Sequence, residues 1–238
     1  MLRTTFALSA VCLAALLAVS ALAGGFTPSA SGSGPSEQVP TASWFGSTGL
    51  IVTPTAYVLD PARAQVGYHH IASDHDAPAV NLYNGNVGII PGLEAGVSRI
   101  DDGFNAETVF NAKYHLQMSK LLNTAGMPDV AVGVFDLSNQ INRAWYVVAS
   151  KQLDLGDKAI PSLGLHLGFA RNKARAGTLD GIFGGVDASI CNKIVAQAEY
   201  DSDKLNGCVR YYPCKWVSLD VGSVHSNLSY GATGHFDW

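Results

Sequence analysis

The sequence predicts an all-β protein: a single antiparallel transmembrane β-barrel of about twelve strands. Three observations support this. The chain begins with a segment that has the form of a secretory signal peptide. From residue 63 onward it consists of short segments in which polar and apolar residues alternate, separated by Gly, Pro, Asn and Asp. These segments are close to the length of about nine to eleven residues that a tilted strand needs to cross a bilayer.

Residues 1–23 have the features of a cleaved signal peptide. Arg3 precedes an apolar run over 6–18, and the small-residue end at 21–23 has the form of a signal-peptidase site. The alternative is an uncleaved membrane anchor. Cleaved export together with a β-barrel predicts the outer membrane of a Gram-negative bacterium, with outer-membrane lipid as the partner.

Residues 24–44 are expected to form a disordered lead. They are rich in Gly, Ser, Pro and Thr, and they contain too few large apolar residues to offset the entropy of ordering. The net charge of −4 becomes −5 once Arg3 leaves with the signal peptide, and only 14% of the residues are charged. A nucleic-acid partner would call for a basic face, so none is expected.

The remaining chain is expected to form one barrel over 63–238, since barrels of this size are often single domains. Turn residues separate the twelve alternating segments. The expected strands are 64–72, 80–90, 93–100, 107–117, 129–137, 142–153, 162–172, 180–190, 193–202, 205–212, 215–224 and 229–238.

The alternation has a period of two in 107–116, 162–169 and 193–201. In the first of these segments, even-numbered residues such as Phe110 are expected to face lipid, and odd-numbered residues such as Lys113 to face the interior. A soluble sandwich shows the same period with its apolar face inward, so the period alone does not separate the two folds.

Strand length, an even strand count and aromatic residues near strand ends favour the membrane barrel. With an even count both chain ends lie on one side, where short turns such as 91–92 are expected. The connections at 118–128 and 154–161 are longer than this rule predicts, and the first is expected to hold a short helix. The aromatic residues are Trp145, Trp216, Tyr230 and Phe236.

Ionisable residues of both signs fall on the expected inward face of the barrel. They either line a narrow water-filled path that contacts sugars or small solutes, or pair across a closed interior and stabilise it. The closed interior is slightly favoured. The expected lumen residues are Glu107, Lys113, His115, His166, Lys193, Glu199, Arg210 and Asp220.

Residues 45–62 are the candidate plug, or a periplasmic segment across the barrel mouth. Leu50, Ile51 and Val52 are too apolar for a solvated linker, while Pro54 interrupts the run before it could join a central strand. The segment therefore needs cover, which the barrel interior or the sheet edge can provide.

The sequence predicts no catalytic residues, no cofactor and no metal site. It has no G-x-S-x-G motif. The residues around His69-His70 are more typical of a strand followed by a polar loop than of a set of metal ligands. Three cysteines remain after the signal peptide, namely Cys191, Cys208 and Cys214, so at most one disulfide can form, and spacing does not choose the pair.

Four short motifs are spread along the expected mature chain: GSTGL at 46–50, TPTA at 53–56, AKYHL at 112–116 and YVVASK at 146–151. They resemble motifs of the YjbH-like outer-membrane proteins, which are associated with exopolysaccharide production. The resemblance covers most of the expected mature chain in a short form that contains only the barrel. It implies an accessory or conduit role in exopolysaccharide secretion, with polysaccharide and secretion proteins as partners, and it supplies no catalytic residues. The alternative is a general or solute-specific pore without a polysaccharide role.

Overall fold

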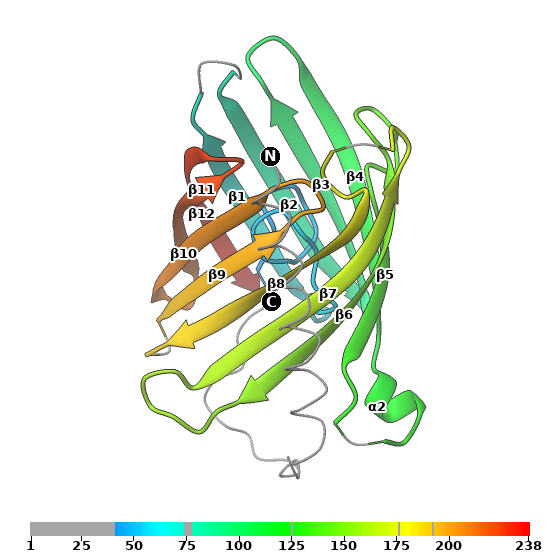
Figure 1. Cartoon of the computed structure of the whole chain (residues 1–238), viewed down its shortest axis with the longest axis vertical. Helices are drawn as coiled ribbons and strands as arrows, with labels where there is room; N and C mark the ends of the chain where they lie inside the picture. Colours follow the sequence, from blue (N-terminus) through cyan, green and yellow to red (C-terminus); the bar gives the residue numbers. More distant parts are fainter. Residues whose placement is uncertain (1–40, 74–77, 125, 176, 192) are drawn as a thin grey trace, which may run out of the picture. The chain divides into compact units, whose positions relative to one another are not determined.

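Twelve antiparallel strands close into one barrel in the computed structural model (Figure 1). The predicted signal peptide and most of the predicted lead lie outside the residues that the structure describes. All described residues belong to one compact unit, Ser36–Trp238. The described residues are 41–73, 78–124, 126–175, 177–191 and 193–238.

The strands are connected in chain order, and the one described helix is a single turn between the fourth and fifth strands. Their bounds are β1 Arg63–Ile71, β2 Val80–Ile90, β3 Leu93–Asp101, β4 Ala106–Leu116, α2 Met118–Leu121, β5 Asp129–Phe135, β6 Ala144–Asp154, β7 Ser162–Asn172, β8 Gly181–Ile190, β9 Ile194–Tyr200, β10 Leu205–Cys214, β11 Val217–Val224 and β12 Asn227–Asp237.

The barrel closes where β1 pairs with β12, from Arg63 opposite Asp237 to Ile71 opposite Ser229. Closure leaves no strand edge exposed, so every strand has a hydrogen-bonded neighbour on both sides. The predicted fold class and strand order are confirmed, and each predicted strand end lies within two residues of the observed one. The short helix predicted in 118–128 is α2.

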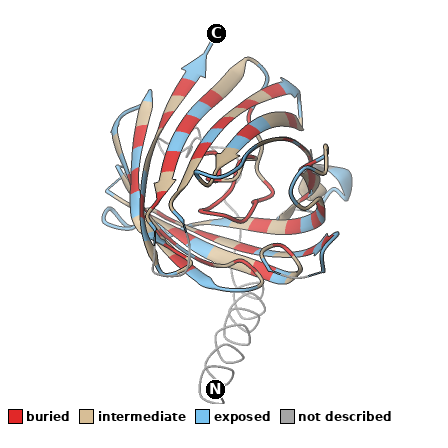
Figure 2. Ribbon diagram, turned by 90° about the horizontal axis from the view of Figure 1, so that it is seen from above, coloured by how far each residue is buried: buried red, intermediate tan, exposed pale blue. Residues whose placement is uncertain are grey.

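Side chains alternate between the interior and the outer surface along each strand, which Figure 2 shows as bands of buried and exposed residues. In β4, Asn111 and Lys113 are buried, while Phe110 is 53% and Tyr114 45% exposed. This is the face assignment that the period-two pattern predicts.

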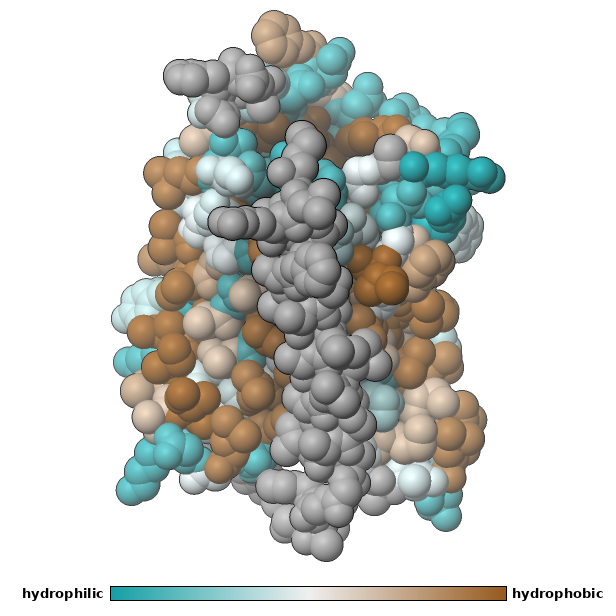
Figure 3. All heavy atoms as spheres, viewed as in Figure 1, coloured by the Kyte–Doolittle hydropathy of each residue, from teal (hydrophilic) through white to brown (hydrophobic). Residues whose placement is uncertain are grey.

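The outer surface is apolar, whereas the interior carries most of the buried charged groups. Figure 3 shows hydrophobic side chains over much of the outer surface of the barrel. An apolar exterior around a polar interior is the reverse of a soluble protein and is typical of a barrel that spans a membrane. The exposed aromatic residues include Tyr68, Tyr83, Trp145, Phe169, Trp216, Tyr230, Phe236 and Trp238.

The two ends of the barrel differ. The end where β1 begins and β12 ends, here called the terminal end, carries the short β2–β3, β8–β9 and β10–β11 turns together with α2. The opposite end, here called the loop end, carries the β1–β2, β3–β4 and β7–β8 connections among others. Short turns are typical of the periplasmic side of outer-membrane barrels, and three of the five terminal-end connections are short, whereas the β4–β5 and β6–β7 connections there are longer. Among the described residues, no helix is long and apolar enough to cross a membrane.

Candidate functional site

Residues 41–62 precede β1, and 41–59 of them lie inside the barrel, surrounded by strands in both views (Figures 1 and 2). We call this segment the insert. It folds on itself, since the N–H of Gly49 donates to the carbonyl of Thr41 at 2.8 Å and the N–H of Leu50 donates to that of Thr53 at 2.9 Å. A Cβ at Gly49 would lie 2.2 Å from the Thr53 carbonyl oxygen, so only glycine fits this tight loop.

The insert includes residues for which the sequence predicted disorder. The predicted lead ends at residue 44, yet 41–44 are buried, and Trp44 is fully covered. The Trp44 ring stacks on that of His69, with 4.9 Å between centroids. The prediction was wrong for these four residues because a large aromatic side chain gives the end of the lead enough apolar surface to order it.

Apolar side chains of the insert pack in the lumen against those of the wall. Trp44, Ile51 and Val52 form a cluster with wall residues that include Leu82 and Val224. Burying large side chains of this kind typically stabilises by about 1.5–3 kcal/mol each. The cluster therefore favours the occluded barrel over an empty one.

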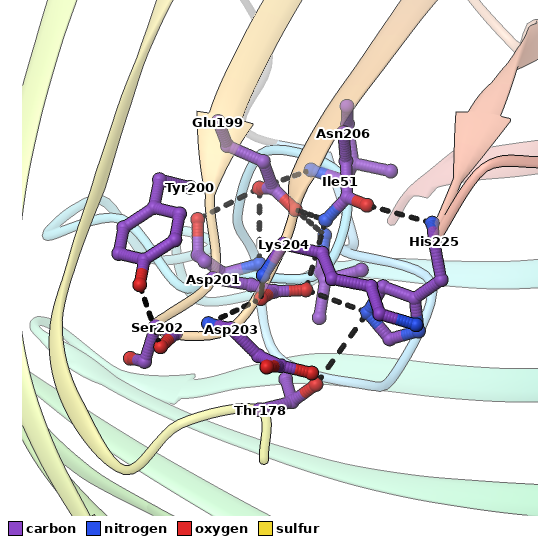
Figure 4. Close-up of polar contacts among 12 residues, drawn as sticks. Ile51, Thr178, Glu199, Tyr200, Asp201, Ser202, Asp203, Lys204, Asn206 and His225 are labelled. Atoms are coloured by element: carbon purple, nitrogen blue, oxygen red, sulfur yellow. Dashed lines mark hydrogen bonds and ion pairs between the residues drawn. The ribbon is translucent and has the colours of Figure 1, made fainter. Parts of the chain in front are cut away.

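Glu199 holds the apolar loop of the insert by its backbone (Figure 4). Its carboxylate accepts the N–H groups of three consecutive residues: Ile51 at 3.1 Å, Val52 at 2.7 Å and Thr53 at 3.1 Å. The Thr53 hydroxyl donates a further bond at 2.8 Å, and the amide of Asn206 donates one at 3.1 Å. These five donors surround a fully buried side chain on β9, which is why a charged carboxylate is tolerated there.

A second set of contacts joins β3 and β4 to the insert. Glu94 accepts the N–H of Thr48 at 2.8 Å and that of Leu59 at 3.0 Å. The Lys113 ammonium donates to the carbonyl oxygens of Thr48 at 2.5 Å and Thr55 at 3.1 Å. Both charged side chains are about 1% exposed, so they bind insert backbone rather than water.

A third set lies on β10 and β11. The Arg210 guanidinium donates to Asp220 at 2.5 Å and also to the Thr41 hydroxyl and, at 3.5 Å, the Leu50 carbonyl. The other oxygen of Asp220 lies 3.2 Å from the His69 ring, under Trp44. This buried ion pair is thus connected to the insert at both ends.

The hydrogen bonds of Glu199 continue through Asn206 into a cluster of polar residues at the loop end (Figure 4). Asp201, which directly follows β9, accepts from the Lys204 N–H at 2.8 Å and the Asn206 amide at 3.0 Å, and it lies 2.6 Å from His225. Burial alone would raise the pKa of Asp201, but these hydrogen bonds outweigh it and hold the pKa below its ordinary value. The β9–β10 loop and the β11–β12 turn are joined through this carboxylate.

A cavity of about 900 Å³ lies between the insert and the terminal end of the barrel. Its inner wall includes Leu50 and Tyr57 of the insert, and residues of the β2–β3 turn and α2 line it toward the terminal end. Polar and ionisable side chains project into it from β4–β10: His115, Asp129, Gln152, His166, Asp187, Gln197, Arg210 and Tyr212.

Ser150, His166 and Asp187 make a hydrogen-bonded chain that resembles a catalytic triad in composition. The Ser150 hydroxyl lies 2.8 Å from His166 Nδ1, and His166 Nε2 lies 2.7 Å from Asp187. The Ser150 oxygen, however, accepts the N–H of Ala56 at 2.8 Å and is about 1% exposed. A nucleophile needs room for a substrate carbonyl, which the insert occupies here, so the arrangement holds the insert in place.

The eight predicted lumen residues fall into three groups. Lys113, His166, Glu199, Arg210 and Asp220 are buried, and each belongs to a contact set described above or to the cavity wall. The remaining three lie toward the barrel ends: Glu107 and His115 are half-buried, and Lys193 is exposed in the β8–β9 turn.

The prediction for Lys193 was wrong. Its odd number gives it the same parity as Val195 and Glu199, but β9 begins at Ile194, so Lys193 lies beyond the strand in solvent. His115 lies 3.3 Å from Asp129 at the terminal end and lines the cavity.

Sequence reasoning missed the polar residues of β1 and β2 that bind the insert. The Gln65 carboxamide accepts the Ala42 N–H at 2.6 Å, the Asn86 amide donates to the Gly46 carbonyl at 2.6 Å, and Asn84 donates to the carbonyl of Trp44 at 3.3 Å. The same period-two pattern places all three on the inward face, so the signal was present in the sequence.

The described residues contain no group of three or more His, Cys, Asp or Glu side chains that could hold a metal ion. His69 contacts Asp220, and His70 contacts Asn81 on the other face; part of the loop that follows, 74–77, lies outside the described residues. Cys191, Cys208 and Cys214 are free thiols, the second buried and the others exposed.

Comparisons with known proteins identify barrels of the same general architecture. No family model and no curated protein matches the chain. A KdgM porin aligns with 14% identity over 73% of this chain and 99% of its own, with a TM-score of 0.49. A triple-mutant porin of Rhodopseudomonas blastica has 14% identity over 67% of this chain and 55% of its own, with a TM-score of 0.33. The N-terminal β-barrel domain of Pseudomonas aeruginosa OprF has 10% identity over 74% of this chain and 98% of its own, with a TM-score of 0.25. We draw no functional conclusion from likeness at this level.

Proposed function

We propose that this chain is a non-enzymatic outer-membrane pore whose lumen is closed by its own N-terminal insert, and that it conducts small solutes when the insert is displaced. The observation that carries the proposal is the way in which the insert is held. Glu94, Lys113 and Glu199 bind it through backbone groups, while no residue of 41–62 forms part of a barrel strand.

Displacing the insert would leave the barrel wall intact, because the twelve strands pair with one another and the insert adds only an isolated bridge between Pro61 and Gly88. The interior that remains would carry charged and amide side chains, which water can hydrate. The contacts of Glu94, Lys113 and Glu199 with the insert are hydrogen bonds to charged groups, which contribute about 1.5–3 kcal/mol each, and water takes their place when the insert leaves. A lumen of this polarity suits hydrophilic solutes.

The apolar exterior and the predicted signal peptide support an outer-membrane location. The full chain should fractionate with outer membranes and migrate faster on a gel unheated than boiled, because a closed barrel offers no free edge at which unfolding can begin. Recovery in the soluble periplasmic fraction would contradict the location.

The pore is tested by electrical recording from the purified full chain in planar lipid bilayers. We expect brief, infrequent openings for the full chain and steady conductance for a variant in which residues 45–59 are deleted. Unheated gel migration of both proteins controls for folding. A deletion variant that migrates as a folded barrel and still conducts no current would refute the pore.

The role in exopolysaccharide secretion that the resemblance to YjbH-like proteins implies stays a prediction. The same recordings test it, since polysaccharide fragments should then reduce the current through the open variant. Conductance that is indifferent to such fragments would favour a pore without a polysaccharide role.

A further inference from the structure

The cavity at the terminal end has the dimensions of a binding site. Its volume of about 900 Å³ falls within the range of roughly 300–1,000 Å³ that is usual for small-molecule pockets. The insert separates it from the loop end, so a solute entering from the terminal end meets this cavity before it meets the closed part of the lumen.

Two hydrogen-bond acceptors in the cavity wall have no partner among the described residues. One is Oδ1 of Asp187 and the other is the carboxamide oxygen of Gln197. The two residues lie directly opposite each other on β8 and β9, and both side chains are more than nine-tenths buried. A buried acceptor without a donor is costly, so this pair is suited to a ligand that brings N–H or O–H groups.

The surroundings of this acceptor pair are negatively charged. Asp187 lies 2.7 Å from His166, and Asp129 lies 3.3 Å from His115. His166 contacts only Oδ2 of Asp187, so Oδ1 of this carboxylate stays available to a ligand. Burial raises the pKa of the Tyr57 hydroxyl, and the charges of Asp129 and Asp187 raise it further, so the field of both carboxylates reaches this insert residue in the cavity wall.

The two arginines in the cavity wall do not cancel this charge, because both are already paired. Arg210 is bound to Asp220. Arg63 lies 3.2 Å from Asp60 and 3.5 Å from Asp237. Asp129 and Asp187 are therefore the carboxylates of the cavity wall that have no arginine partner among the described residues.

We propose that this cavity is a binding site for an organic cation that carries several N–H donors, of the guanidinium or primary ammonium class. Such a ligand satisfies the acceptors of Asp187 and Gln197 and compensates the carboxylate charge, which gives charge-assisted hydrogen bonds. A neutral polyol supplies donors without the charge, and an anion is repelled. The proposal rests on the proposed pore, since it names the class of solute that the pore admits from the terminal end.

Gly164 positions the acidic side of the site. A Cβ at this residue would lie 2.0 Å from Asp187 Oδ2 and 2.8 Å from His166 Nε2. An alanine there must displace the His166–Asp187 pair, so Gly164→Ala should weaken cation binding without removing any charge.

Calorimetric titration of the refolded full chain in detergent micelles tests the site with L-arginine amide as the probe. Citrulline amide, a neutral analogue of nearly the same shape, is the matched ligand control. We expect Asp187→Asn to weaken binding about tenfold or more, since it removes a charge-assisted bond, and Gln197→Met to weaken it several-fold. Asp203→Asn removes the same charge from an exposed loop residue at the opposite end and should leave binding unchanged.

Equal affinity for the two probes, or full affinity in both cavity variants, would overturn the proposal. If unheated gel migration shows that Asp187→Asn does not fold, the affinity of Gln197→Met is the deciding measurement. The carboxamide oxygen of Gln197 has no hydrogen-bond partner among the described residues, so its removal breaks no contact of that oxygen within the barrel. The titration measures binding independently of any current through the pore. Binding without conductance would therefore refute the pore and keep the site, whereas conductance without binding would refute the site and keep the pore.

Discussion

Replacing Glu199 with glutamine tests how firmly the insert is held. One carboxylate oxygen accepts the N–H of Ile51 together with the N–H and hydroxyl of Thr53; the other accepts the N–H of Val52 and the amide of Asn206. Glutamine keeps one oxygen and replaces the other with an NH₂ group, which accepts nothing. The variant is nearly isosteric, so the barrel wall is unchanged.

The expected loss follows from this geometry. If the glutamine oxygen takes the side with three donors, the amide nitrogen faces Val52 and Asn206, and two hydrogen bonds are lost. Asn206 belongs to β10, so of these two bonds only the one from Val52 joins the insert to the wall. A hydrogen bond to a charged group contributes about 1.5–3 kcal/mol, so the insert should be held less firmly by about that amount. Even the lower figure shifts the ratio of closed to open barrels roughly tenfold.

Single-channel recording in planar bilayers measures this ratio as the open probability. Glu107→Gln is the matched control, since it makes the same chemical change on the expected inward face at a residue to which none of the described insert contacts goes. We expect a large rise in open probability for Glu199→Gln alone. If wild type and both variants migrate as folded barrels and have the same open probability, the claim that Glu199 holds the insert in place is refuted.

Two further predictions concern the barrel wall and the loop end. Ala112 on β4 is expected to face lipid, so Ala112→Arg should cost about 2–4 kcal/mol near the membrane midplane, measured by refolding into lipid vesicles; a tolerated arginine would mean that the face assignment is reversed. Asp201 has a lowered pKa, so its contribution to stability is present above its unfolded pKa of about 3.9 and is lost as pH falls through the lower folded value. Thermal unfolding between pH 7 and pH 2 should therefore be less pH-dependent in Asp201→Asn than in wild type, and identical profiles would contradict a paired carboxylate.

The strands were predictable because their signal is local. A period of two over about ten residues, interrupted by Gly, Pro, Asn and Asp, fixes both a strand and its two faces without any knowledge of distant partners. The error at Lys193 shows the limit of this reasoning: parity gives the face, but the first residue of β9 depends on the geometry of the preceding turn.

The contacts of the insert were not predictable, because they join residues far apart in the chain. Glu199 binds Ile51 across 148 positions, and no local pattern indicates which backbone segment a buried carboxylate will meet. Glu94 illustrates a second reason. It is buried in β3, where Gly96 and Ser98 share its face and give a weak polar signal, while Arg99 on the other face blurs the alternation. Apolar composition did indicate that Leu50–Val52 needs cover, but it left the barrel interior and the sheet edge equally open.

The charged contacts explain how one barrel interior can suit both a closed and an open state. Buried charges are costly unless they are paired or hydrated. With the insert in place, Glu94, Lys113 and Glu199 are satisfied by its backbone groups, and with the insert displaced, water can take the same positions. Opening therefore exchanges the hydrogen bonds to these charged groups for hydrogen bonds to water, and it also exposes the apolar cluster around Trp44, Ile51 and Val52. Both changes favour the closed barrel, but only the charged residues, which bind particular backbone groups, determine where the insert lies.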